Sequence, residues 1–215
     1  MEYAEVKDLM ELFALVLSIF LAILMGIYIR KNKPHITFWF FAWVIISIRT
    51  YMSILEPITG IPHALIFGFV RDVLIVIADL LFLVGICYLL GLGREYKHYI
   101  PALFFFTHIG ISGILYLFLD SLLLGAAFTN LFTNPVLLFL VFYFFNEGAI
   151  RSHTHSLRLI SIGFLLWGID FVIFGPLYYG AGYQFAGMCG WTIGFIARTV
   201  ILVGFLLLVP TKKMV

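Results

Sequence analysis

Seven apolar runs, each long enough to cross a lipid bilayer as a helix, recur along this chain between short polar or glycine- and proline-rich stretches. An α-helix rises about 1.5 Å per residue, so roughly 20 apolar residues span a hydrocarbon core of about 30 Å. We expect membrane-spanning helices at residues 11–30, 36–55, 70–91, 99–118, 122–145, 157–177 and 187–209. These helices use almost all of residues 1–215, so the sequence predicts one all-α domain, a polytopic seven-helix membrane bundle without a separate soluble part.

The composition supports a membrane protein and argues against other classes. The chain is 63% hydrophobic and 11% charged, whereas soluble domains are about 25% charged. A net charge of +2 gives no indication of a nucleic-acid partner. No basic segment precedes the first apolar run, so we expect no cleaved signal peptide. The expected product is a multi-pass protein of the cell membrane, with the lipid bilayer as its surroundings.

The basic residues between the expected helices indicate an orientation. Nine of them fall on one side of a seven-crossing arrangement: Arg30, Lys31, Lys33, Arg94, Lys97, Arg151, Arg158, Lys212 and Lys213. The other side holds Lys7, and Arg71, which stands with Asp72 at the outer end of the third helix. Because cytoplasmic loops carry the excess of lysine and arginine, the sequence predicts an N-terminus outside and a C-terminus in the cytoplasm.

Four charged residues fall inside the expected helices, near the middle of the membrane or in its outer half. They are Arg49, Asp79, Asp170 and Arg198. A charge at mid-membrane costs about 2.5–3.5 kcal/mol on insertion scales, so such groups are expected to be paired, hydrated or functional. Two tryptophans share their helix faces: Trp167 lies one turn before Asp170, and Trp191 lies seven residues from Arg198.

These charges allow two interpretations. The first is a set of ion pairs that fixes the register of the helices, in which either acid pairs with either arginine. The second is an outward-facing polar cavity that binds a small ligand or relays a proton. In that case the ligand-binding residues would be Arg49, Asp79, Asp170, Arg198, Trp167 and Trp191.

Two further features allow a structural or a functional interpretation. Pro135 follows a run of polar residues in the fifth helix and predicts a kink near mid-membrane, or a ligand contact. The loop before the last helix carries Tyr178, Tyr179, Tyr183 and Phe185. These aromatic residues would form either a belt at the membrane interface or a lid over a cavity.

Several chemistries are disfavoured by the residues present. A retinal protein needs a lysine deep in its last helix, and none of the six lysines lies inside an expected helix. Haem b would need two facing intramembrane histidines, and only His108 is deep. Candidate metal ligands are scattered in depth, and no loop carries a nucleophile–base or phosphate-binding motif. We therefore expect no enzyme activity, no cofactor and no metal.

Three stretches resemble a known group of membrane regions. They are FWFFAWVIISIRTYMSIL with Trp39, Trp43 and Arg49, LFLVGICYLLG, and SLRLISIGFLLWGIDFVIFGPL with Trp167 and Asp170. These stretches are similar to the multi-helix sensor regions that precede the kinase or cyclase domain of bacterial and archaeal histidine kinases and diguanylate cyclases. The resemblance implies a seven-helix receptor that signals to the cytoplasm. The sequence shows no output domain, so a separate cytoplasmic signalling protein would be its partner.

Two other function classes compete with a sensor. A small, possibly proton-coupled transporter would use two triplets, the first three and the last three helices, around the fourth helix. The order of the buried charges is reversed between the triplets. The base precedes the acid in the first, at Arg49 and Asp79, and the acid precedes the base in the second, at Asp170 and Arg198. A membrane scaffold or assembly subunit would instead present its buried charges to a helix of a partner protein.

Overall fold

The computed structural model describes residues 3–29, 33–59, 64–180 and 184–208, and these residues are almost entirely helical. Seven of its helical stretches are long and apolar enough to cross a membrane. The elements are α1 (Tyr3–Ile29), α2 (Pro34–Thr59), α3 (Ala64–Leu89), η1 (Glu95–Tyr99), α4 (Ile100–Gly113), η2 (Ile114–Phe118), α5 (Leu122–Phe128), η3 (Thr129–Thr133), α6 (Asn134–Ser152), α7 (His155–Gly175), η4 (Pro176–Gly180) and α8 (Gln184–Leu208), where η marks a π-helical turn.

The expected helices are present, but three boundaries differ from the prediction by more than four residues. The first helix begins at Tyr3 rather than at residue 11, the third begins at Ala64 rather than at residue 70, and the fifth crossing continues to Ser152 rather than ending at residue 145. The longer α3 places Arg71 and Asp72 about two turns inside the helix, where Asp72 is fully buried. The expectation that this charged pair stands at the outer end of the helix was therefore wrong. The added residues before Arg71 are mostly apolar, and they continue the helix toward the membrane surface.

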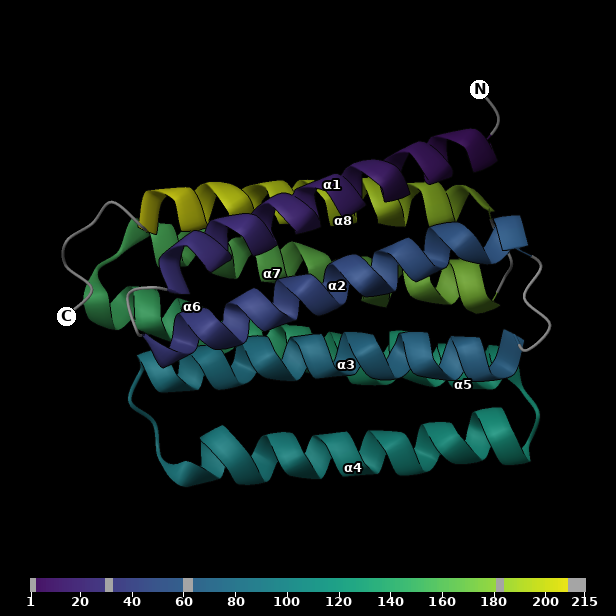
Figure 1. The fold of residues 1–215 in the computed structure, drawn as a ribbon, viewed down its shortest axis with the longest axis horizontal. Coiled ribbons are helices and arrows are strands. Elements are labelled where there is room, and N and C mark those ends of the chain that lie inside the picture. Colours follow the sequence, from purple (N-terminus) through teal and green to yellow (C-terminus); the bar gives the residue numbers. More distant parts are fainter. Residues whose placement is uncertain (1–2, 30–32, 60–63, 181–183, 209–215) are drawn as a thin grey trace.

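The helices lie side by side along one direction, and successive crossings alternate in direction (Figure 1). The first turn of α1 and the last turn of α8 lie at opposite ends of the bundle, as an odd number of crossings requires (Figure 1). Helix α4 stands at one edge and packs against α3 and the segment formed by α5 and η3. Its large apolar side chains are half-buried or exposed, and Leu103, Phe106 and Ile111 are exposed, as expected for a helix that faces lipid on several sides.

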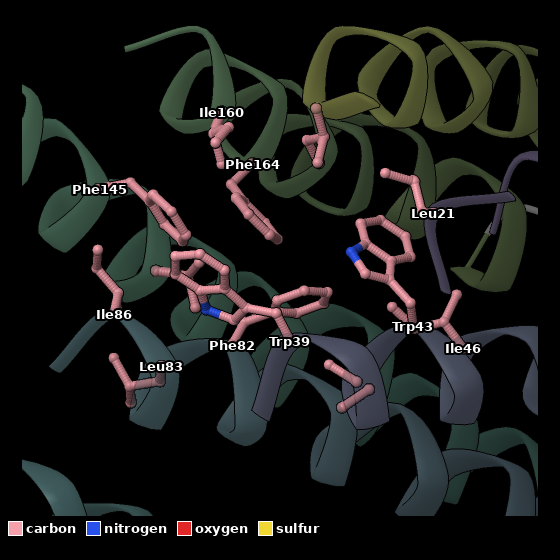
Figure 2. Packing of buried hydrophobic residues seen from close by; sticks show 14 of the residues in the cluster. Leu21, Trp39, Trp43, Ile46, Phe82, Leu83, Ile86, Phe145, Ile160 and Phe164 are labelled. Atoms are coloured by element: carbon pink, nitrogen blue, oxygen red, sulfur yellow. The ribbon is translucent and has the colours of Figure 1, made fainter. Parts of the chain in front are cut away.

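An aromatic core joins four helices in the half of the bundle where α2 and α7 begin (Figure 2). Phe82 of α3 lies 5.0 Å between ring centroids from both Trp43 of α2 and Phe164 of α7. Phe145 of α6 lies 5.4 Å from Phe164 and from Trp39. Edge-to-face and offset pairs of this kind add about 0.5–1.5 kcal/mol each to the area they bury. This half of the bundle is consequently filled by rings.

The fifth crossing contains a π-helical turn immediately before Pro135, where the sequence predicted an interruption. Proline has no N–H to continue the helical hydrogen bonds, and the chain accommodates this with a wider turn. Nearby side chains bond the backbone: Thr129 Oγ1 donates to Gly125 O at 3.2 Å and Asn130 Nδ2 donates to Ala126 O at 2.8 Å.

Helices α7 and α8 approach each other closely at two glycines. A β-carbon at Gly204 of α8 would lie 3.0 Å from both Ile160 N and Ser156 O, which are backbone atoms of α7. A β-carbon at Gly163 of α7 would lie 2.9 Å from Ala197 O. Small residues at such positions allow helix backbones to pack tightly in a membrane.

We predict that Gly204→Ala destabilises the bundle because the added methyl group meets backbone that cannot move aside. Overpacking of this kind costs about 1–3 kcal/mol, which corresponds to a fall in melting temperature of about 3–10 °C. The matched control is Gly110→Ala on α4, where a β-carbon meets no atom within 4 Å. Thermal unfolding of both variants in the same detergent checks this, and equal melting temperatures would contradict the tight α7–α8 contact.

Candidate functional site

A cavity lies among α2, α3, η3, α7, η4 and α8, toward the end of the bundle where α8 begins. The space open to the centres of water-sized molecules is about 90 Å³. One water needs about 10–15 Å³ on this measure, so the cavity holds several waters or one small organic molecule. Its polar or amphipathic lining residues are Arg49, Asn130, Trp167, Asp170, Tyr178, Trp191 and Arg198.

The structure brings five of the six predicted ligand-binding residues to this one cavity. These are Arg49 from α2, Trp167 and Asp170 from α7, and Trp191 and Arg198 from α8. The sixth, Asp79 of α3, does not line the cavity. It is fully buried behind the lining, and neither of its carboxylate oxygens has a hydrogen-bond partner.

The expected network of mutual ion pairs does not form among the described residues. No N–O distance of 4.0 Å or less joins Asp79 or Asp170 to an arginine there. Arg198 is 2% exposed, and its Nε and Nη1 atoms have no hydrogen-bond acceptor. The structure therefore keeps acid and base apart, although Asp170 and Arg198 lie on neighbouring helices.

Tryptophan rings lie against the guanidinium groups of Arg49 and Arg198. Arg198 Cζ is 4.7 Å from the ring centroid of Trp167 and 5.8 Å from that of Trp191. Arg49 Cζ is also 5.8 Å from the Trp191 ring. Contacts within about 6 Å of a ring stabilise a cation by roughly 0.5–2 kcal/mol. The rings orient both arginines while leaving donor atoms of Arg198 without acceptors.

The aromatic core packs against Trp167, one of the residues that line the cavity. Trp167 is stacked on Trp43 with ring centroids 6.3 Å apart and on Phe164 at the same distance. Trp43 is fully buried and Trp167 is 3% exposed. The Trp167 ring, which lies against the guanidinium group of Arg198, is thus fixed by its neighbours. The position of the guanidinium group therefore depends on the packing of the core.

The aromatic residues that the sequence placed before the last helix lie in different surroundings. Tyr178 lines the cavity, whereas Phe185 is 54% exposed. The ring of Tyr178 also lies against Gly187, where a β-carbon would be only 2.8 Å away. The side chains of Tyr179 and Tyr183 lie outside the described residues.

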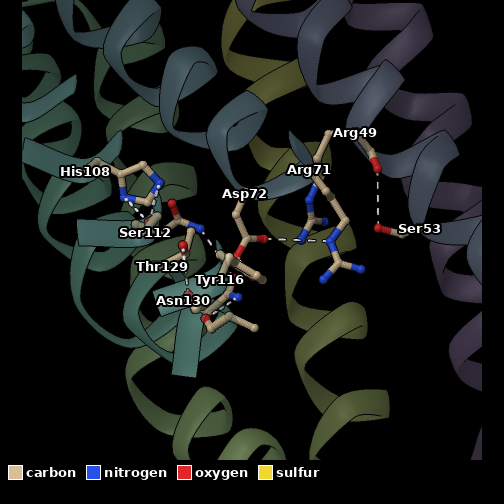
Figure 3. A network of polar contacts seen from close by, with 12 residues as sticks. Arg49, Ser53, Arg71, Asp72, His108, Ser112, Tyr116, Thr129 and Asn130 are labelled. Atoms are coloured by element: carbon tan, nitrogen blue, oxygen red, sulfur yellow. Dashed lines mark hydrogen bonds and ion pairs between the residues drawn. The ribbon is translucent and has the colours of Figure 1, made fainter. Parts of the chain in front are cut away.

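Figure 3 shows a second buried polar cluster that the sequence did not reveal. The hydroxyl of Tyr116 in η2 donates to Asp72 Oδ2 at 2.6 Å, and Arg71 Nε lies 3.7 Å from Asp72 Oδ1. Beside it, His108 Nδ1 lies 3.2 Å from Thr133 Oγ1. The only sequence signal was Asp72 itself, because Tyr116 and Asp72 are 44 residues apart and the predicted helix boundary placed Asp72 at the membrane surface.

This cluster neighbours the cavity through two residues. Asn130 of η3 lines the cavity, one residue after the buried Thr129. Arg49 of α2 also lines the cavity, and it lies beside Arg71 in Figure 3. The cavity and the cluster thus adjoin at α2 and η3.

Comparisons with protein-family models, with curated proteins and with solved structures give no match to this chain. The function is accordingly argued from the geometry of the cavity.

We predict that Tyr116→Phe lowers stability by about 1–3 kcal/mol, because Asp72 would lose a short hydrogen bond in a buried place. The control is Tyr143→Phe, since Tyr143 is 56% exposed. Melting temperatures in detergent check the difference between the two. In an Asp72→Ala background, Tyr116→Phe should lose most of its effect, because the cycle removes the shared interaction. An undiminished effect there would contradict the role of the Asp72 bond.

Proposed function

We propose that this chain is a membrane sensor or receptor-like module that binds a small molecule in the cavity between α2, α7 and α8. The observation that supports it most is Arg198, which lines the cavity, is 2% exposed, and forms no hydrogen bond or ion pair within the described part of the chain. A charge in a membrane bundle that served packing alone would be expected to be paired, or replaced by apolar residues at lower cost. An arginine that packs against tryptophan rings and has no acceptor among the described residues is suited to bind an acceptor group of a ligand.

The proposed orientation has the cavity on the outer side. Five of the basic residues used for orientation are described, and all lie near the end of the bundle opposite the cavity: Lys33, Arg94, Lys97, Arg151 and Arg158. Arg30, Lys31, Lys212 and Lys213 lie outside the described residues. Under the positive-inside rule this arrangement favours a cytoplasmic side at the basic end and an N-terminus outside.

Signal transfer would use the pair α7 and α8. The cavity contains Asp170 from α7 and Arg198 from α8, and the two helices pack closely all the way to the basic end. A ligand that bridges the two side chains would favour one relative position of the helices, and small helix shifts are a common switching movement. A separate cytoplasmic signalling protein would bind the cytoplasmic ends of α7 and α8 and respond to their movement. The proposal includes no catalytic step.

The filled inner half favours a sensor over a transporter. A transporter must expose its site to each side in turn. Between this cavity and the basic end lie the closely packed rings of Trp43, Phe82, Phe145 and Phe164, all of them fully buried. Opening a path there would separate several aromatic pairs at once, whereas a receptor keeps them together.

A ligand screen tests the proposed function. The full chain in lipid nanodiscs is heated with members of a library of small polar metabolites, and compounds that raise its melting temperature are collected. We expect such compounds to lose their effect with Arg198→Gln, because the donors that face the cavity are gone. The control Arg151→Gln alters an arginine at the basic end, paired with Glu147 at 2.8 Å, and should retain the effect. If every stabilising compound acts equally on Arg198→Gln, the cavity is not the binding site.

Asp79→Asn separates a ligand role from a structural one. Asp79 lies behind the lining and near the charge of Arg49, so its neutralisation should change ligand affinity while the fold survives. A variant with lower melting temperature and unchanged affinity would show that Asp79 serves stability alone. Liposome flux of the bound compound, which a sensor should not produce, discriminates against the transporter.

A further inference from the structure

We propose that the cavity takes a small zwitterion of the α-amino-acid type, with its carboxylate on Arg198 and its ammonium group on Asp170. This inference rests on the proposed function, since it names the class of molecule that the cavity would bind. It depends on three features of the cavity: unused donors on one side, an unpaired acceptor group opposite, and an apolar wall beside them.

Arg198 supplies the carboxylate site. Its guanidinium group lies 4.7 Å from the ring of Trp167, and the ring accepts no strong N–H hydrogen bond from it. Within the described ranges, Nε and Nη1 have no acceptor, and arginine binds a carboxylate in a planar arrangement through Nη2 together with one of these two atoms. Glu11 of α1 is the other acid whose charge reaches Arg198 beside Asp170, but Glu11 pairs with Lys7 at 3.2 Å.

Asp170 supplies the opposite site. Its carboxylate lines the cavity, and in the described part of the chain it forms neither an ion pair within 4.0 Å nor a hydrogen bond. The group is 9% exposed, so few waters can solvate it. A partly buried carboxylate without a donor is suited to a ligand group that brings several N–H donors, as an ammonium group does.

Two glycines keep the space between the sites open. A β-carbon at Gly194 would lie 3.7 Å from Arg198 Nη1 and 3.9 Å from Asp170 Oδ2. A β-carbon at Gly190 would lie only 2.8 Å from Asp170 Oδ1. The charged groups of Arg198 and Asp170 thus both lie close to Gly194, but they are too far apart from each other to form an ion pair. An α-amino acid carries its two charges on one carbon, and hydrogen bonds of about 2.9 Å on each side would bridge such a gap.

Arg49 is the reason to favour a zwitterion over a simple anion. Two arginines and one aspartate line the cavity, which would by itself favour a net negative ligand. Arg49, however, has a further interaction within the molecule besides its contact with Trp191. Asp170 and Arg198 form no hydrogen bond or ion pair within the described residues, so this balanced pair is the part of the lining left for the ligand. A ligand without net charge completes it.

The apolar part of the wall fits a hydrocarbon side chain. Ile75, Phe171 and Phe174 line the cavity together with the ring of Trp191. The amide of Asn130 is already used, because its Nδ2 donates to Ala126 O and its Oδ1 accepts from Asn134 Nδ2 at 3.4 Å. The hydrocarbon surface of Ile75, Phe171 and Phe174 favours an apolar side chain on the ligand, and we expect an apolar amino acid.

The test compares three versions of the same carbon skeleton. The full chain in lipid nanodiscs is titrated with L-alanine, L-valine, L-leucine and L-phenylalanine, and with the analogues of each that lack either the ammonium group or the carboxylate. We expect at least one amino acid to bind, and both of its analogues to bind about tenfold more weakly or worse. The Trp fluorescence of the cavity and isothermal calorimetry provide two independent readouts.

Two variants assign the ends of the ligand. Asp170→Asn should weaken binding of the amino acid about tenfold but leave the carboxylate-only analogue unchanged. Arg198→Gln should weaken the amino acid and leave the amine-only analogue unchanged. Arg151→Gln, at the basic end of the bundle, should alter none of them.

The outcomes separate this inference from the proposed function. If the carboxylate-only analogue binds as tightly as the amino acid, the ligand is a simple anion, and the zwitterion is wrong while the receptor remains. If none of the four amino acids binds but library compounds still stabilise the chain through Arg198, the ligand class is again wrong. If no compound depends on Arg198, the receptor proposal fails and this inference fails with it.

Discussion

The separation of Asp170 from Arg198 is the constraint on which the structure of the cavity depends. In an interior of low polarity, opposite charges on adjacent helices attract strongly, and pairing is the usual result. Here the guanidinium group is drawn toward Trp167 and Trp191, and glycines at positions 190 and 194 provide space rather than a bridge. The stability that direct pairing of Asp170 and Arg198 would contribute is therefore absent from this arrangement.

The rest of the bundle holds that arrangement in place. Trp167 is fixed by Trp43 and Phe164, and α7 and α8 are held together through the glycine contacts near Gly163 and Gly204. On the other side, Asp72 with Tyr116 connects α3 to the outlying α4 segment through one short hydrogen bond. The buried polar groups therefore have two roles. Asp72 and Tyr116 hold two helical segments together, whereas Asp170 and Arg198 line the cavity.

The sequence predicted the position of the charged residues along each helix far better than the face of the helix on which they lie. Counting residues from the membrane surface placed Arg49, Asp170 and Arg198 at similar depth, and they do meet. Depth does not give the rotation of a helix, so Asp79 was expected in the cavity and lies behind it. Asp72 was misplaced because an apolar stretch continued α3 past its expected start. The π-helical turn at Thr129–Thr133 shifts the faces of the fifth crossing by one residue, which a regular period cannot anticipate.

The stacked indoles of Trp43 and Trp167 give the molecule a built-in optical reporter. The positive charge of Arg198 sits 4.7 Å from one ring of the pair, and the emission of an indole is sensitive to a charge so close to it. Any event that neutralises or moves that guanidinium group must alter the spectrum of the unmodified protein. Occupancy could then be followed in native membranes without a dye, a tag or an engineered residue.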